Sequence, residues 1–99
     1  MHYLLCYDLA PDYLERRGQF RTPHLQLAWD AQQRGELVLA GALSDPADMA
    51  ILMFQGHSPE VAERFAKADP YVTEGLVVAY TVRLLNTVVG ELAFSPVRL

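Results

Sequence analysis

The segment from Ser58 to Asp69 constrains the fold most, because it places a carboxylate on the apolar side of a predicted helix. Ser58 is a favourable N-cap residue, and Pro59 suits the first helical position. The apolar residues at helical spacing are Val61, Ala62, Phe65 and Ala68. Asp69 continues this face, and Pro70 behind it predicts that Asp69 lies in the last turn. Because an unpaired buried charge costs several kcal/mol, Asp69 needs a partner elsewhere in the chain.

Length and composition limit what this chain can be. The 99 residues predict one domain over residues 1–99, in which residues 87–99 form a C-terminal extension. No apolar run approaches the roughly 20 residues that cross a bilayer, and no secretory signal is recognisable, so we expect no membrane partner. The net charge of −4, with no basic cluster beyond Arg16-Arg17, argues against nucleic-acid binding. With Cys6 as the single cysteine, we expect a cytoplasmic protein without an internal disulfide.

The rest of the pattern predicts the order strand, helix, strand, strand, helix, strand. The expected strands cover His2–Asp8, Glu36–Ala42, Met49–Gln55 and Leu76–Leu85. Gly18 and Pro23 interrupt the helical region after the first strand. The expected pieces are a short helix over Asp12–Arg17, a loosened stretch over Gly18–Thr22 and a main helix over Pro23–Arg34. Gly35 is the predicted stop.

This order predicts an α+β fold of the ferredoxin-like βαββαβ type, a four-stranded antiparallel sheet with two helices on one face. The first and last strands are apolar on both faces, so the second face of the sheet also needs a cover. A second copy of the chain supplies that cover most simply. We therefore expect a homodimer through the open sheet face, a dimeric α+β barrel.

The candidate partner of Asp69 is His24. On the main helix it shares one side with Phe20, Leu27, Ala28 and Ala31. Because both helices lie on the same face of the predicted sheet, His24 and Asp69 can meet. A carboxylate bound to one ring nitrogen fixes the tautomer and leaves the other nitrogen free as a base or an acid. Two interpretations remain open with about equal weight: a catalytic pair, or a structural pair that joins two helices.

Three motifs resemble the YciI-like (YCII-related domain) family of the dimeric α+β barrel superfamily. They are Arg21-Thr22-Pro23-His24-Leu25, Ala40-Gly41-Ala42, and Ala68-Asp69-Pro70-Tyr71 with Gly75. The resemblance extends from the first strand to the last, and it implies a His–Asp pair that acts as acid–base machinery in a small pocket. By motif match, His24 and Asp69 take those positions, and Arg21 matches the arginine that often precedes the histidine. Some relatives are muconolactone-type dehalogenases. The short turn at Ser44–Asp48 departs from the family, where many relatives carry a longer loop.

Three further residues are candidates for substrate binding. Arg21 is suited to a bidentate contact with a carboxylate, and Tyr71 to a hydrogen bond with a substrate oxygen. Gly41 permits close approach of a backbone or a bulge. Each also has a plainer interpretation, as a surface arginine, a core tyrosine and a strand glycine. No spacing resembles a zinc site, and no glycine-rich loop leads from a strand into a helix, so we expect no metal and no cofactor.

The functional hypothesis is an acid–base enzyme, an isomerase, lyase or dehalogenase-like protein. In it His24, oriented by Asp69, moves a proton on a small lactone or carboxylate metabolite. The alternative is a dimer without catalysis that binds a small ligand or uses the pair only structurally. A weaker alternative is a cofactor-independent monooxygenase of the related barrels.

Overall fold

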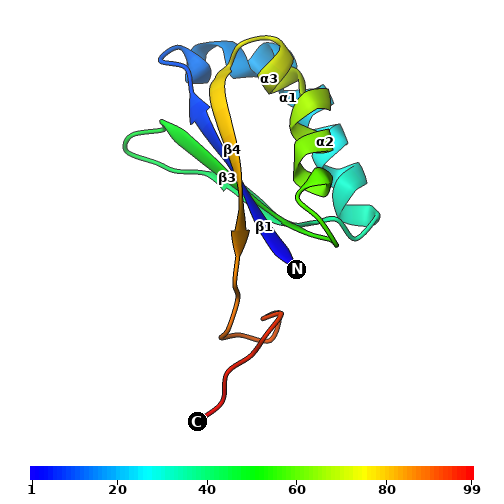
Figure 1. Cartoon of the computed structure of the whole chain (residues 1–99). Helices are drawn as coiled ribbons and strands as arrows, with labels where there is room; N and C mark the ends of the chain where they lie inside the picture. Colours follow the sequence, from blue (N-terminus) through cyan, green and yellow to red (C-terminus); the bar gives the residue numbers. More distant parts are fainter.

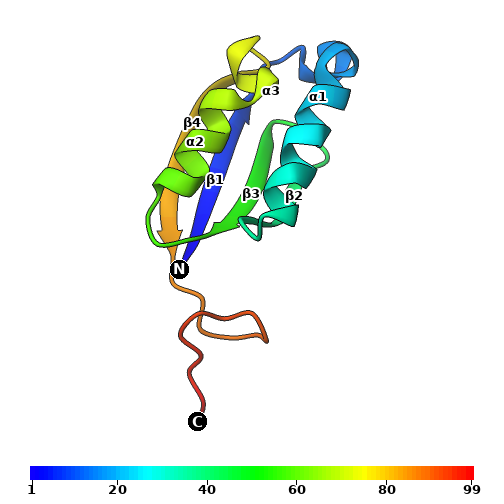
Figure 2. The ribbon, with the colours of Figure 1, turned by 90° about the vertical axis from the view of Figure 1, so that its right-hand side faces the viewer.

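The computed structural model describes all 99 residues and consists of a four-stranded sheet with its helices on one side (Figure 1, Figure 2). The strands are β1 (His2–Leu9), β2 (Leu37–Ala42), β3 (Met49–Gln55) and β4 (Val77–Leu85), and the helices are α1 (Tyr13–Gln33), α2 (Glu60–Ala68) and α3 (Pro70–Thr73). The order β2-β3-β1-β4, antiparallel throughout, is the predicted ferredoxin-like plan. The short α3 follows α2 after a single intervening residue, Asp69.

The face of the sheet that the helices cover holds the core. Residues directly opposite one another in antiparallel strands point to the same side. Tyr3, Leu5 and Tyr7 of β1 form the central row, and all three are buried. Their partners are Phe54, Leu52 and Ala50 on β3, and Leu84, Val82 and Tyr80 on β4. The hydrophobic face of α2 and the inward side of α1 pack onto these rows.

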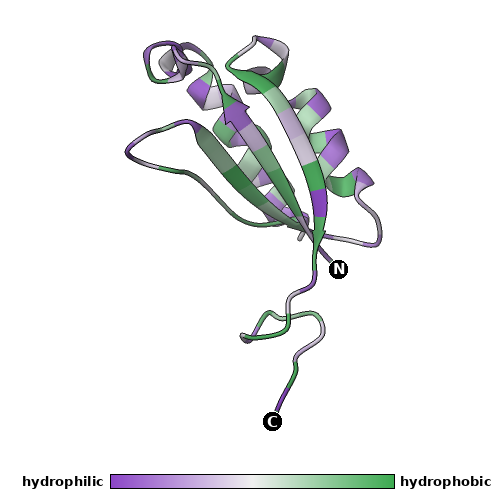
Figure 3. Cartoon of the chain, turned by 60° about the vertical axis from the view of Figure 1, so that its left-hand side comes forward, coloured by the Kyte–Doolittle hydropathy of each residue, from purple (hydrophilic) through white to green (hydrophobic).

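The opposite face of the sheet is not covered by the helices and is apolar over much of β3 and part of β1 (Figure 3). Leu4 and Cys6 of β1 pair with Met53 and Ile51 of β3, and all four are half-buried. On β4, however, this face carries Thr81 and Arg83. The prediction that the last strand is apolar on both faces was therefore wrong, and β3 supplies the apolar surface instead.

A register shift explains part of this difference. It falls between Asp8 and Leu9, where Leu9 pairs with Val77. The shift brings Val77 into the core, whereas simple alternation placed it on the side of Thr81.

Helix α1 is continuous over 21 residues, so the predicted interruption at Gly18–Thr22 was wrong. Pro23 lies inside the helix, where it removes one backbone N–H. Ala28 and Ala31 are buried, and packing of this side outweighs the local cost of Gly18 and Pro23. The predicted stop is correct, because Gly35 has a φ of 79°, the left-handed conformation that ends many helices.

The junction between α2 and α3 places Asp69. The helix begins at Glu60, with Pro59 and not Ser58 at the N-cap position, so the predicted cap was wrong by one residue. The Ser58 hydroxyl accepts a hydrogen bond of 3.3 Å from the Glu60 N–H. The prediction that Asp69 lies in the last turn of α2 was wrong. Asp69 lies directly after the helix and has an extended backbone conformation, with a ψ of 121°. Pro70 explains this conformation, because proline disfavours the helical region for the residue before it. Asp69 instead caps α3, since its carboxylate accepts the Tyr71 N–H.

The tail beyond β4 runs away from the sheet (Figure 1). The Thr87 hydroxyl lies 2.7 Å from His2 Nδ1 and accepts a hydrogen bond of 2.8 Å from the Phe94 N–H. These contacts hold the beginning of the tail near the N-terminal end of β1. Farther along, apolar side chains such as Val97 are exposed. Among the helices of the chain, none combines the length and apolarity that a membrane span requires.

Replacing Pro23 by alanine is expected to stabilise the protein by about 1 to 3 kcal/mol, because alanine restores the missing N–H and removes the ring from the helix interior. Urea unfolding followed by circular dichroism measures the change. Gln32→Ala, at an exposed position of the same helix, is the control and is expected to shift stability by less than about 0.5 kcal/mol. A Pro23→Ala protein less stable than the parent would contradict this account of α1.

Candidate active site

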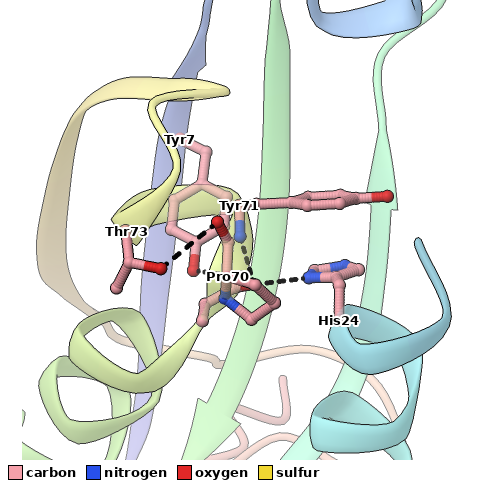
Figure 4. Close-up of polar contacts among 6 residues, drawn as sticks. Tyr7, His24, Pro70, Tyr71 and Thr73 are labelled. Carbon is pink, nitrogen blue, oxygen red and sulfur yellow. Dashed lines mark hydrogen bonds and ion pairs between the residues drawn. The ribbon is translucent and has the colours of Figure 1, made fainter. Parts of the chain in front are cut away.

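Asp69 is the centre of the site. Its side chain is fully buried and accepts three hydrogen bonds. His24 Nδ1 lies 2.8 Å from Oδ1, the Tyr71 N–H donates to Oδ1 at 3.0 Å, and the Tyr7 hydroxyl donates to Oδ2 at 2.8 Å (Figure 4). An ionised carboxylate only accepts hydrogen bonds, so all three groups are donors. The structure thus brings together His24 and Asp69, the two residues that the sequence indicated, from α1 and the α2–α3 junction.

The His24 ring is held in one orientation. It stacks on the Tyr71 ring with centroids 3.8 Å apart and planes 6° from parallel (Figure 4), and it meets Phe65 edge-on at 6.5 Å. Because Nδ1–H donates to Asp69, the neutral ring carries its free lone pair on Nε2. Nε2 makes no hydrogen bond within the chain, and the side chain keeps 14% of its surface exposed. The ring therefore presents one nitrogen to a ligand.

Tyr7 is a further member of the candidate site, and the sequence did not indicate it. It is buried on β1, and burial, together with the Asp69 charge and the hydrogen bond to it, raises the pKa of Tyr7 far above its ordinary value. The phenol therefore stays protonated and donates permanently to Asp69. The available signal was a tyrosine on the inward side of a strand, because a buried phenol usually needs a partner for its O–H.

Tyr71 contributes a hydroxyl that has no partner. The residue is 3% exposed, and its hydroxyl oxygen is a buried polar atom without a hydrogen bond. Burial raises the pKa of Tyr71, whereas the charges of Arg21 and Arg17 act in the opposite direction. The net shift keeps the hydroxyl neutral and able to donate.

These side chains border a pocket of about 820 Å³ between α1 and the β2–β3 hairpin. His24, Tyr71 and Tyr7 are among its lining residues, and Arg17 and Arg21 line it from α1. Arg21 was predicted here, but Arg17 was not. Neither arginine forms an ion pair.

Gly41 also lines the pocket, from β2. A Cβ atom built at Gly41 meets nothing within 4 Å, so no part of the chain approaches it closely. The irregularity of β2 lies between Leu37 and Leu39, not at Gly41, so the suggested bulge at that glycine is wrong. No group of three or more His, Cys, Asp or Glu side chains comes together in a way that would hold a metal ion.

The pocket therefore combines a fixed imidazole base, a neutral hydroxyl donor and two unpaired cations. This set is suited to moving a proton on an anionic ligand.

Comparison with protein families matches residues 1–86 to the model described as the YCII-related domain. The match ends just after β4 and leaves the tail outside it. A comparison with curated proteins found no match.

Solved structures with the same fold include the 5-chloro-2-hydroxyhydroquinone dehydrochlorinase of Burkholderia phenoliruptrix AC1100, in complex with 2,5-dihydroxybenzoquinone. It has a TM-score of 0.74 and 18% identity, over 88% of this chain and 95% of its own. The protein Atu4242 of Agrobacterium tumefaciens has a TM-score of 0.58 and 17% identity, over 95% and 98% of the two chains. A NIPSNAP family protein of A. tumefaciens strain C58 has a TM-score of 0.53 and 21% identity, over 98% of this chain and 97% of its own. At these identities, the likeness shows the fold alone.

Replacing Tyr7 by phenylalanine is expected to destabilise the protein by about 1.5 to 3 kcal/mol, because the charged Asp69 loses one of three buried donors. Tyr3→Phe is a matched control on the same strand and face, since the Tyr3 hydroxyl contacts only the Met1 sulfur, at 4.0 Å. It should cost less than about 0.5 kcal/mol. Equal unfolding free energies for the two variants in urea would show that the Tyr7–Asp69 bond contributes little.

Proposed function

The chain belongs to the family of YCII-related domains, and we propose that it is an acid–base enzyme in which His24 moves a proton on a small organic anion. One observation supports this most: the Asp69-bound imidazole presents its free Nε2 to a pocket. A pair that only joined two helices would need neither a cavity nor an open ring nitrogen.

The proposed step is removal of a proton from a carbon next to a carbonyl group. The C–H bond breaks, its electron pair moves into the carbonyl as an enolate, and Nε2 takes the proton. The imidazolium that forms is stabilised by the Asp69 carboxylate. The proton then returns to another carbon, which is isomerisation, or the electron pair expels a leaving group, which is elimination.

The dehydrochlorinase of B. phenoliruptrix, by its name, removes hydrogen chloride from a chlorinated hydroxyhydroquinone. Such a reaction is an elimination that begins from an acidic ring hydroxyl or its keto form. The shared fold supports a dehalogenase-like reaction as one form of the proposed chemistry. The size of the pocket, about 820 Å³, accommodates a ring of that kind.

We also propose that two copies of the chain pack through the open sheet face and form a cytosolic homodimer. The support is the apolar surface of Leu4, Cys6, Ile51 and Met53, which nothing within the chain covers. A contiguous apolar patch on the surface of a protein often marks a site where another protein packs. Since the pocket lies on the helix side of the sheet, dimerisation through this face leaves its lining residues in place.

Replacing His24 by glutamine is expected to lower the rate of the proton transfer at least about a hundredfold, because general-base catalysis typically contributes this much or more. Deuterium uptake from D₂O, followed by NMR, measures the rate on a panel of small lactones, keto acids and 5-chloro-2-hydroxyhydroquinone. Asp69→Asn should lose a similar factor, because it leaves the ring tautomer unfixed. His57→Gln, at an exposed histidine, is the matched control and should keep the parent rate. The proposal fails when the parent protein catalyses no exchange across the panel, or when the His24 variant matches it.

Replacing Ile51 by lysine is expected to convert the dimer to a folded monomer, because the substitution places a charge in the centre of the apolar face. Sedimentation velocity reports the mass, and circular dichroism confirms the fold. Gln33→Lys adds the same charge at an exposed position of α1 and should leave the dimer intact. A parent protein that sediments as a monomer at micromolar concentration would exclude this interface.

A further inference from the structure

We propose that Arg17, Arg21 and the Tyr71 hydroxyl form a carboxylate-binding subsite, which selects a small cyclic monocarboxylate and holds its charged end beside His24. This inference rests on the proposed function, since it names the class of substrate on which that base acts. Three independent features of the pocket carry it.

The first feature is the unpaired Tyr71 hydroxyl. Burying a hydroxyl without a partner costs free energy, and nearly all such groups in native proteins are hydrogen-bonded. Tyr71 is 3% exposed and lines the pocket, yet its hydroxyl has no partner in the chain. Its backbone N–H, in contrast, is fully used by Asp69. The hydroxyl is therefore a donor available to a ligand oxygen.

The second feature is the pair of arginines one turn apart on α1. Like charges at this spacing destabilise a helix unless an anion compensates them. Arg16, next to them in the sequence, is compensated: it lies 3.9 Å from Asp12 and donates to the Glu74 carbonyl oxygen at 2.8 Å. Arg17 and Arg21 have no acidic partner and line the pocket instead. The missing compensation fits an anion that the chain itself does not supply.

A series of aromatic contacts positions Arg17 relative to Tyr71. The Arg17 guanidinium carbon lies 5.7 Å from the centroid of the Tyr13 ring, over its face. Tyr13 in turn meets the Tyr71 ring edge-on at 5.7 Å, and Tyr71 stacks on His24. Contacts between neighbouring side chains therefore connect the Arg17 guanidinium to the Tyr71 ring, which carries the free hydroxyl, and to the His24 imidazole. Burial raises the pKa of Tyr71, and the charges of Arg21 and Arg17 lower it in part, which agrees with a position of both arginines near its hydroxyl.

The third feature is the opposite side of the pocket, which selects the rest of the ligand. Small apolar residues of β2 and β3 line it, among them Ala40, Ala42 and Ala50. They leave room for a flat apolar body and offer no donors. Asp45 lines the hairpin side and disfavours a second anionic group there. A ligand with charge at one end only matches this distribution.

A carboxylate fits the charged end better than a phosphate or a neutral carbonyl. Its two coplanar oxygens match the fork of a guanidinium group, which forms paired hydrogen bonds with them. A neutral carbonyl would leave both cations uncompensated. A phosphate ester would bring a second charge into a pocket that is mostly apolar.

The test uses benzoate as the probe and benzamide as its neutral isostere, with binding to the full-length protein measured by calorimetry and by NMR. We expect benzoate to bind at least about tenfold more tightly than benzamide, which is a difference of about one ionic hydrogen bond. Arg17→Gln, Arg21→Gln and Tyr71→Phe should each weaken benzoate binding by about tenfold and leave benzamide binding unchanged. Arg16→Gln is the matched control on the same helix and should change neither affinity.

Tyr71→Phe removes only one oxygen and keeps the ring that stacks on His24, so its effect reports the hydroxyl. Arg17→Lys keeps the charge without the fork and should lose part of the benzoate affinity. Equal affinities for benzoate and benzamide, or unchanged benzoate binding in the Arg17 and Tyr71 variants, overturn the subsite.

The subsite and the proposed proton transfer can be separated with His24→Gln. This variant should bind benzoate within about twofold of the parent, because His24 is not one of the three proposed anion contacts. Charge-selective binding without any His24-dependent exchange supports the subsite and removes the enzymatic proposal. Deuterium exchange that depends on His24 but shows no preference for carboxylates supports the enzymatic proposal and overturns the subsite.

Discussion

The structure depends on how a buried carboxylate is compensated. Asp69 is completely buried, and it is tolerated because three donors reach it from β1, α1 and α3. Hydrogen bonds to a charged group contribute roughly 1.5 to 3 kcal/mol each, and removing a partner from a buried charge costs about 3 to 5 kcal/mol. The same contacts that satisfy Asp69 therefore fix the position of its neighbours. Tyr7, His24 and Tyr71 cannot move independently of it.

The site follows from this arrangement. Pro70 holds Asp69 in an extended conformation between two helices, so that its carboxylate caps α3 and still faces α1. Tyr71 is the second residue of α3, its ring lies flat against His24, and its buried hydroxyl has no partner within the chain. A short break in the helix thus supplies both the acid that orients the base and the hydroxyl beside it. The anion subsite and the proton-transfer group are two consequences of one junction.

The two faces of the sheet have separate roles. The helix-covered face holds the core, and the pocket opens on that side, between α1 and the β2–β3 hairpin. The open face is apolar on β1 and β3 but carries Arg83 on β4. Charged residues on edge strands oppose uncontrolled pairing of sheets, and β4 is such an edge. The apolar surface therefore extends from β1 and β3 to the exposed Leu39 on the other edge strand, β2, and Arg83 bounds it on the β4 side.

The sequence by itself determined the order of the strands, the position of α2 to within a residue at each end and the presence of an acid and a histidine on inward sides, because periodicity acts locally. It did not determine that α1 continues through Pro23, since burial of Ala28 and Ala31 outweighs local propensity. It also did not indicate Tyr7 or Arg17. Periodicity shows which way a side chain points, but not which atoms of other elements lie within hydrogen-bonding distance. Only the packing of the helices on the sheet brought Tyr7, His24 and Tyr71 within hydrogen-bonding distance of Asp69 and placed Arg17 at the pocket.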